Sequence, residues 1–186
     1  MAVSTDVRGA HRIVVYGVTG SGKSVFAGRI SAATGLPYYS VDDLTWEPGW
    51  IEVPLDEQRR RISAICDQDE WILDSAYGKW ADLPLGRAEL IVGLDYPRWR
   101  SLGRLLRRTA IRLVERQPVC NGNRESLRTL FGPDSIVAWH FRSFGRKRSR
   151  MRRWEADPEV PAVLRLTSPT QADRLLDEVS QTRPGT

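Results

Sequence analysis

Hydrophobic residues in this chain gather in five short runs, and longer segments with helical spacing lie between them. Short apolar runs bounded by glycine or polar residues are typical of buried strands, and apolar positions three and four residues apart are typical of helices. The pattern predicts strands at residues 12–16, 36–40, 71–73, 89–94 and 162–166. It predicts helices at residues 24–33, 54–68, 97–116, 134–153 and 169–179.

Alternating strands and helices predict an α/β protein of three layers, in which helices cover both faces of a five-stranded parallel sheet. The chain of 186 residues is long enough for a core of its own, and we assign residues 1–186 to a single domain. Ligands of such sheets bind beyond the carboxyl ends of the strands. Asp42, Asp74 and Asp95 follow three of the predicted strands and are expected at that edge. Aspartates also serve there as caps or turn residues, and for Asp95 both interpretations stay open.

The segment between the first strand and the first helix reads Gly-Val-Thr-Gly-Ser-Gly-Lys-Ser, a complete G-x-x-x-x-G-K-[ST] phosphate-binding loop. Its backbone N–H groups and the positive end of the helix dipole favour a bound phosphate. The three glycines are expected to supply positive φ angles and close approach of the ligand. Lys23 is expected to reach the β- and γ-phosphates, and Ser24 to offer its hydroxyl to Mg²⁺. The predicted nucleotide-binding residues of this segment are Gly17, Val18, Thr19, Gly20, Ser21, Gly22, Lys23, Ser24 and Val25.

The net charge of +5 is unevenly distributed along the chain. Residues 98–153 contain fifteen arginines and one lysine against three acidic residues, a local charge of +13. We interpret residues 110–153 as an arginine-rich lid over phosphates, with residues 117–133 as its mobile part, although such a block also suits nucleic acid. No apolar segment is long enough for a membrane span or resembles a signal sequence. We therefore expect a cytoplasmic monomer or homodimer without a membrane partner.

Four segments carry a resemblance to a known family. They are the phosphate-binding loop, D-D-L-T-W-E-P-G-W at residues 42–50, E-W-I-L-D at residues 70–74 and L-D-Y-P-R-W at residues 94–99. With them the chain resembles the small P-loop kinases of the adenylate kinase and shikimate kinase type, and among these the bacterial DNA topology modulation proteins. The resemblance implies a sheet with strand order 2-3-1-4-5, ATP with Mg²⁺ as cofactors, and a lid.

The resemblance also assigns roles to single residues. Asp74 matches the aspartate that holds Mg²⁺ through water in adenylate kinases. Arg104 matches the arginine that lies against the adenine, and Arg108 matches the next one. The arginines that clamp the transferring phosphate fall among Arg142, Arg146, Arg148 and Arg150, and we take Arg146 and Arg150 as the catalytic candidates.

One departure from adenylate kinases bears on the acceptor. Those enzymes place an arginine after the second strand to hold the phosphate of the acceptor nucleotide, whereas this chain has Asp42 and Asp43 there. A carboxylate repels an anionic acceptor, but it can orient a hydroxyl and accept its proton. Asp42 is the first candidate for this role and Asp43 the second. Trp46 and Trp50 would wall a small-molecule pocket, stack on a base, or pack the loop on the core.

These observations predict a phosphotransferase that moves the γ-phosphoryl group of ATP to a small acceptor, through a hydroxyl of that acceptor. A nucleoside monophosphate kinase is one alternative. A nucleic-acid-binding regulatory ATPase, as in DNA topology modulation, is another, and the tryptophans interleaved with the basic block favour it.

Overall fold

The computed structural model describes residues 7–115, 118–119, 121–124 and 135–181. Its centre is a sheet of five parallel strands in the order β2-β5-β1-β6-β9. Counted along the chain as first to fifth, these strands stand in the order 2-3-1-4-5, as predicted. Their bounds are β1 Arg12–Gly17, β2 Tyr38–Tyr39, β5 Trp71–Leu73, β6 Leu90–Leu94 and β9 Ala162–Leu166.

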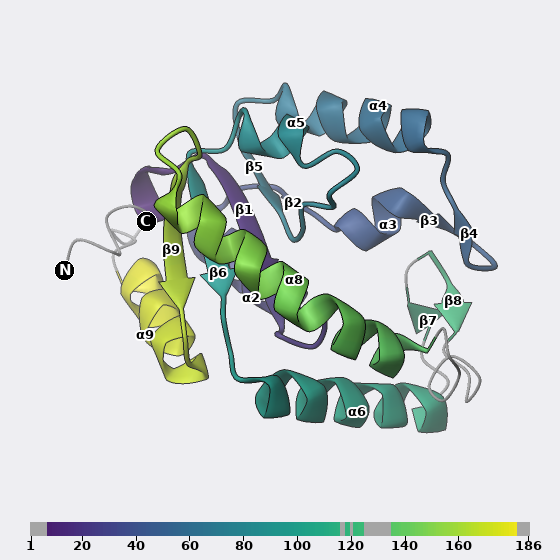
Figure 1. Ribbon diagram of the computed structural model, residues 1–186. Helices are drawn as coiled ribbons and strands as arrows, with labels where there is room; N and C mark the ends of the chain where they lie inside the picture. The colour runs from purple at the N-terminus through teal and green to yellow at the C-terminus, as the bar shows by residue number, and fades with distance from the viewer. Residues whose placement is uncertain (1–6, 116–117, 120, 125–134, 182–186) are drawn as a thin grey trace.

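Helices cover both faces of this sheet and give the predicted three layers (Figure 1). One face carries α2 and α9, while α4, α5 and α8 lie on the other, and α6 runs beside α8 at the edge of the molecule. The helices are α2 Lys23–Thr34, α3 Val41–Thr45, α4 Leu55–Cys66, α5 Asp82–Leu85, α6 Arg98–Glu115, α8 Ile136–Ala156 and α9 Pro169–Ser180. Two small antiparallel hairpins pair β3 Trp46–Glu47 with β4 Ile51–Glu52, and β7 Pro118–Val119 with β8 Asn123–Arg124.

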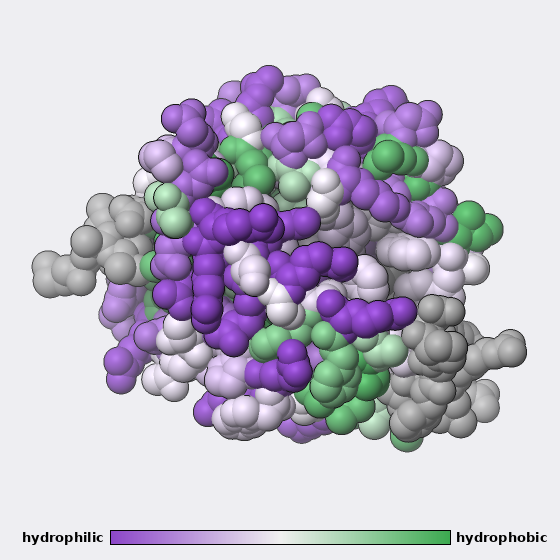
Figure 2. Space-filling view, in the orientation of Figure 1, coloured by the Kyte–Doolittle hydropathy of each residue, from purple (hydrophilic) through white to green (hydrophobic). Residues whose placement is uncertain are grey.

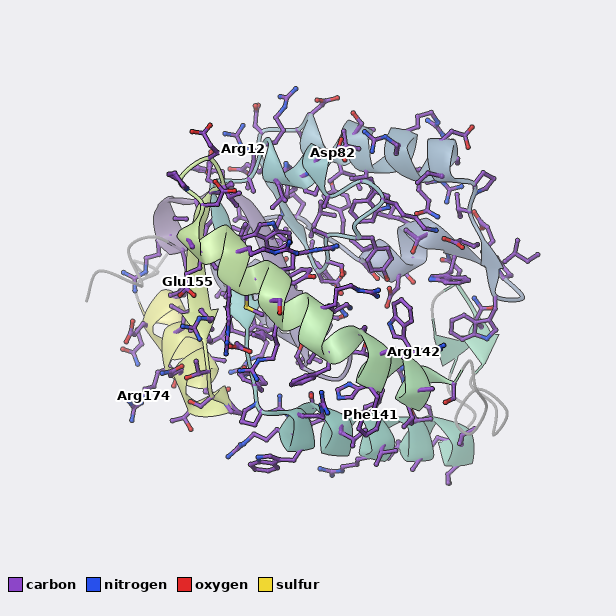
Figure 3. All side chains as sticks on the ribbon, in the orientation of Figure 1. Arg12, Asp82, Phe141, Arg142, Glu155 and Arg174 are labelled. Carbon is purple, nitrogen blue, oxygen red and sulfur yellow. The ribbon has the colours of Figure 1, made fainter. Side chains whose placement is uncertain are left out.

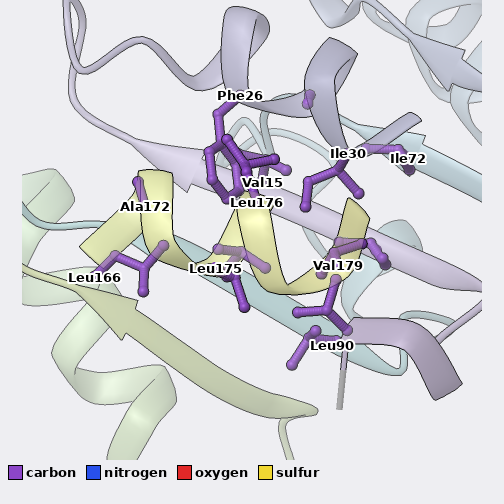
Figure 4. Packing of buried hydrophobic residues seen from close by; sticks show 14 of the residues in the cluster. Val15, Phe26, Ile30, Ile72, Leu90, Leu166, Ala172, Leu175, Leu176 and Val179 are labelled. Carbon is purple, nitrogen blue, oxygen red and sulfur yellow. The ribbon is translucent and has the colours of Figure 1, made fainter. Parts of the chain in front are cut away.

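Two hydrophobic clusters, one on each face, hold the layers together. Alternate residues of β1 divide between them, since successive side chains of a strand point to opposite faces. Val15 packs with Phe26 and Ile30 of α2 and with Leu175 and Leu176 of α9 (Figure 4). The second cluster contains Val14, Ile62, Trp71, Trp80 and Met151. The sheet is therefore buried on both faces, and its functional groups lie at the strand ends.

The predicted strands and long helices are present, with ends that differ by a few residues. Residues 41–43 were expected to continue the second strand. They instead open α3, because the Ser40 hydroxyl caps that helix by accepting a hydrogen bond from the Asp43 N–H at 3.4 Å. Of the expected mobile segment 117–133, residues 117, 120 and 125–133 lie outside the described residues. Within the described ranges, no helix is both long and apolar enough to cross a membrane.

Candidate functional site

The phosphate-binding loop joins the carboxyl end of β1 to α2 at the centre of the sheet. Gly20 and Gly22 have φ angles of 81° and 91°, which residues with a side chain rarely adopt. A Cβ atom on Gly20 would also lie 2.2 Å from the Ser101 carbonyl oxygen on α6. Gly17 differs from the expectation, because its φ is not positive. Its lack of a side chain serves packing instead, since a Cβ atom there would lie 2.6 Å from Ser21 Oγ.

The start of α2 is open for an anion. Gly22 caps this helix without a capping side chain, whereas Ser135 and Ser168 cap α8 and α9 with their hydroxyls. The first backbone N–H groups of a helix have no partner within the helix. At α2 these groups, together with the half-buried Lys23 that begins the helix, remain available to a phosphate.

Arg104 on α6 contacts the phosphate-binding loop directly. Its Nη1 donates a hydrogen bond of 3.1 Å to the Ser21 carbonyl, and its guanidinium lies 5.4 Å from the centre of the Tyr96 ring. Burial raises the pKa of Tyr96, and the charge of Arg104 opposes that rise. The residue expected beside the adenine thus lies at the loop itself. Arg108 follows one turn later on α6 and is exposed.

Asp74 is the candidate metal carboxylate. It is 2% exposed at the end of β5, and its two oxygens accept hydrogen bonds from the Tyr38 hydroxyl at 3.0 Å and the Val41 N–H at 2.9 Å. Burial is the main cause that raises the pKa of Tyr38, and the negative charge of Asp74 raises it further. The Ser24 hydroxyl, which lies beside Tyr38, acts in the opposite direction. Tyr38 therefore lies between the two predicted metal ligands, Ser24 and Asp74.

This donor set fits Mg²⁺. One hydroxyl and one carboxylate are hard oxygen ligands, and Mg²⁺ commonly uses one or two protein ligands together with phosphate oxygens and several waters. Two hydrogen bonds leave lone pairs on the Asp74 carboxylate, which has about four acceptor positions. The described residues contain no cluster of three or more His, Cys, Asp or Glu side chains that could hold a metal on their own.

Asp42 is the candidate acceptor-side carboxylate. It is half-buried in the first turn of α3, and its Oδ1 accepts a hydrogen bond from the Tyr77 hydroxyl. Asp43, the second candidate, is exposed. Tyr77 was missed by the sequence interpretation, because it lies in an irregular segment after β5 without a recognisable motif.

Lys147 on α8 is a second residue that the sequence interpretation missed. Burial lowers the pKa of its ammonium group to about 7, and the nearby positive charge of Lys23 acts in the same direction. Asp42 lies close enough to oppose this effect. Lys147 therefore lies near both Lys23 and Asp42. The available signal was that it is the only lysine in a block of fifteen arginines.

The candidate arginines of α8 have different surroundings. The Arg150 guanidinium lies next to Gly78 and near the Tyr16 hydroxyl. Burial raises the pKa of Tyr16, and Arg150 opposes that rise. Arg146 lies 5.5 Å from the Trp139 ring centre. Figure 3 shows Arg142 in the half of α8 where the helix begins. Figure 2 shows hydrophilic side chains over much of α8, with a hydrophobic area near its start.

Arg148 and Asp95 form a structural ion pair. The Arg148 guanidinium donates to both Asp95 oxygens, and Arg165 of β9 donates to one of them at 3.3 Å. Asp95 directly follows β6 and is 3% exposed. Its contacts with the two arginines connect the end of β6 to α8 and β9. These contacts are structural, but they are ion pairs and not the cap or turn contacts that were the alternative for Asp95. Arg148 is occupied by the same pair.

Asparagines of the β7–β8 hairpin hold the β3–β4 hairpin. Asn121 Nδ2 donates to the carbonyls of Asp43 and Trp46, at 2.8 and 2.7 Å. The Asn123 side chain accepts from the Trp50 N–H at 2.8 Å and donates to the Glu47 carbonyl at 3.0 Å. Trp46 and Trp50 meet edge to face, with ring centres 6.0 Å apart. These contacts hold the segment of Trp46 and Trp50, which directly follows α3.

Comparison with known proteins gives a likeness of fold. No family model and no curated protein matches the chain. Among solved structures, shikimate kinase from Acinetobacter baumannii in complex with shikimate has a TM-score of 0.57 and 16% identity, covering 96% of this chain and 95% of that one. Shikimate kinase from Bacteroides thetaiotaomicron has a TM-score of 0.55 and 12% identity, with 92% and 97% covered. A gluconokinase from Sinorhizobium meliloti 1021 has a TM-score of 0.50 and 20% identity, with 91% and 89% covered.

The fold is that of the P-loop kinases. At these identities the likeness concerns architecture, so the chemistry of this chain has to be argued from its own residues.

Proposed function

We propose that this protein is an ATP-dependent phosphotransferase that moves the γ-phosphoryl group to a hydroxyl of a small acceptor. The observation that supports this most is the juxtaposition of opposite charges at one edge of the sheet. The phosphate-binding loop with Lys23 lies on the donor side, and Asp42 with Tyr77 lies on the acceptor side. Lys147 is close to both sides.

Binding of the donor falls to the phosphate-binding loop and α2. The open N–H groups of the loop hold the β-phosphate, and Lys23 neutralises charge on the γ-phosphoryl group. Ser24 and Asp74 would hold Mg²⁺, which would neutralise phosphate charge when bound. Arg146 and Arg150 clamp the transferring group from α8. Their guanidinium forks suit phosphate oxygens.

Transfer requires that a proton leave the acceptor. The acceptor oxygen bonds to the γ-phosphorus while the bond from that phosphorus to the β–γ bridging oxygen breaks, and the electron pair leaves with ADP. The hydroxyl proton moves to Asp42, whose orientation is fixed by Tyr77. Electrostatics favour this assignment, because an anionic phosphate acceptor would be repelled at the same position.

Nucleic-acid binding is a second candidate function, and it rests on a different observation. Exposed arginines line both α6 and α8, and Trp99 is 68% exposed among them. Such a surface suits phosphate backbones and stacked bases, as expected of a DNA topology modulation protein. A salt titration of DNA binding tests it, because phosphate contacts make affinity fall steeply with salt. Salt-independent or absent binding would reject this candidate.

An acceptor screen tests the main proposal. ADP release from ATP and Mg²⁺ is measured against sugars, polyols, hydroxy acids, nucleosides and nucleoside monophosphates. We expect saturable stimulation by a hydroxyl compound that carries no phosphate. Fast, saturable phosphorylation of AMP, CMP, GMP or UMP would instead establish a nucleoside monophosphate kinase and reject the role given to Asp42.

A further inference from the structure

His140 joins α8 to the phosphate-binding loop. Its side chain is 0% exposed, and its Nδ1 lies 3.0 Å from the carbonyl oxygen of Thr19. A carbonyl oxygen only accepts hydrogen bonds, so Nδ1 must carry the hydrogen. Burial lowers the pKa of His140, and the charges of Arg98 and Lys147 act in the same direction, whereas the Thr19 carbonyl opposes them. The ring is therefore neutral at pH 7, with its hydrogen on Nδ1.

This hydrogen bond fixes the direction of one peptide group in the loop. In a planar trans peptide the C=O and the following N–H point in opposite directions. A Thr19 carbonyl held toward His140 therefore turns the Gly20 N–H away from His140. Gly20 has no side chain, so its backbone can adopt more conformations than that of other residues, including the positive φ angle seen here. The orientation of the Thr19–Gly20 peptide therefore needs a restraint from outside the loop.

We propose that His140 is a positioning residue of the phosphate-binding loop, whose Nδ1–H orients the Thr19–Gly20 peptide so that the Gly20 N–H faces the bound phosphate. This inference rests on the proposed binding of a nucleotide to the loop. It also gives α8 a second task, because the helix that presents Lys147 and Arg150 to the site is anchored to the loop by the same contact.

The surroundings of His140 favour a positioning role. The Phe144 and Phe141 rings lie 5.6 and 5.9 Å from the imidazole and restrict its rotation. Its Nε2 is buried, and the described part of the chain gives this atom no hydrogen-bond partner. The hydrogen bond to the Thr19 carbonyl is thus the polar contact that the histidine ring makes here. Arg104 of α6 also donates to the Ser21 carbonyl, so side chains of two helices contact the loop.

Two substitutions separate the role of Nδ1 from the space that the ring fills. Asparagine places an N–H close to the position of Nδ1, whereas the amide of glutamine lies close to the position of Nε2. Calorimetry with ADP and with ATP–Mg²⁺ should give nearly wild-type affinity for His140→Asn. For His140→Gln we expect affinity roughly 10-fold weaker, which corresponds to one lost hydrogen bond. His11→Gln changes the other histidine, which is exposed at the opposite end of β1, and serves as the control.

The ¹⁵N spectrum of His11→Gln, in which His140 is the remaining histidine, should show a neutral ring with the hydrogen on Nδ1 at pH 7. A hydrogen on Nε2 would overturn the inference. So would equal affinity in His140→Gln and wild type, or equal losses in His140→Asn and His140→Gln with both variants folded by circular dichroism. If the wild type bound no nucleotide, the proposed function would be rejected and this inference with it. If the wild type binds nucleotide and one of the contrary results above is found, this inference alone fails.

Discussion

Lys147 is the residue at which stability and function conflict most clearly. A lysine pKa of about 7, against an ordinary value of 10.5, means that folding places a positive charge where the loss of solvent and the neighbouring positive charges disfavour it. A bound phosphate would reverse this balance, because it adds negative charge close to the ammonium group. We therefore expect Lys147 to be unfavourable in the free protein and favourable in the complex with nucleotide.

Lys147→Met should raise the melting temperature of the free protein at pH 7 and lower turnover about 10-fold or more. The stability gain depends on pH with a definite sign. Below pH 7 both folded and unfolded wild type bind the proton, and the gain is largest. Between pH 7 and 10.5 the unfolded chain binds more protons, so wild-type stability rises and the gain shrinks. Thermal melts of both proteins across this range measure it, and a gain that grows with pH would contradict the assigned pKa.

Asp42→Asn should lower acceptor-dependent turnover by about 10²- to 10⁴-fold, the usual contribution of a general base, while ATP affinity stays close to wild type. Asp43→Asn is the matched control, since that neighbouring carboxylate is exposed. Steady-state kinetics with the acceptor found in the screen decide the matter. Similar losses in both variants, or lost ATP affinity in Asp42→Asn alone, would remove Asp42 from the role of base.

Among single residues, the sequence predicted best where a motif fixes the backbone. Gly20, Gly22 and Lys23 lie where the loop motif requires them. His140 and Lys147 reach the site from a helix more than a hundred residues away in sequence, and helical periodicity cannot indicate which residue meets the loop. Asp95 stayed undecided for the same reason, because its partners Arg148 and Arg165 come from other elements.

Among the elements, the two small hairpins behave as one unit. Each strand has two residues, which is too short to be stable alone, and asparagine side chains join the hairpins. Periodicity could not predict them, since two residues define no pattern. The family resemblance marked residues 42–50, but the contacts of this segment with Asn121 and Asn123 follow from tertiary structure alone.

Asn123→Ala should loosen the β3–β4 hairpin. Asn123 is 3% exposed, and the substitution removes its hydrogen bonds with the Trp50 N–H and the Glu47 carbonyl, at a cost of about 1–3 kcal/mol. Hydrogen exchange at the Trp50 amide should become faster, and KM for the acceptor should rise more than KM for ATP. Asn123→Asp keeps the acceptor for Trp50 and should show a smaller effect on exchange at that amide. Unchanged hydrogen exchange at the Trp50 amide in Asn123→Ala would mean that the β3–β4 hairpin is stable without the contacts of Asn123.

At the scale of the whole molecule, one buried carboxylate joins the sheet to the helix that carries the site. Asp95 binds Arg148 of α8 and Arg165 of β9, and burial of the carboxylate makes an unpaired charge costly. Strand order and layering were predicted correctly because alternating strands and helices leave few topologies, and the family resemblance selected among them.

Asp95→Asn should lower the free energy of unfolding by about 2–3 kcal/mol, less than for a fully buried pair because both arginine side chains are 31% exposed. Asp173→Asn, which breaks the exposed pair with Arg29, should cost less than about 1 kcal/mol. Urea denaturation of both variants measures the difference. Equal costs would show that Asp95 contributes no more than a surface ion pair.

The fate of the γ-phosphoryl group tests the proposed function most directly. Wild type, Lys23→Ala and Lys79→Ala are incubated with γ-labelled ATP, Mg²⁺ and the acceptor found in the screen; Lys79 is the control because it forms a surface pair with Glu52. We predict label on the acceptor hydroxyl with wild type and Lys79→Ala, and almost none with Lys23→Ala although that variant remains folded. Label found only in inorganic phosphate, or transferred equally well by Lys23→Ala, would contradict a phosphotransferase that works through this loop.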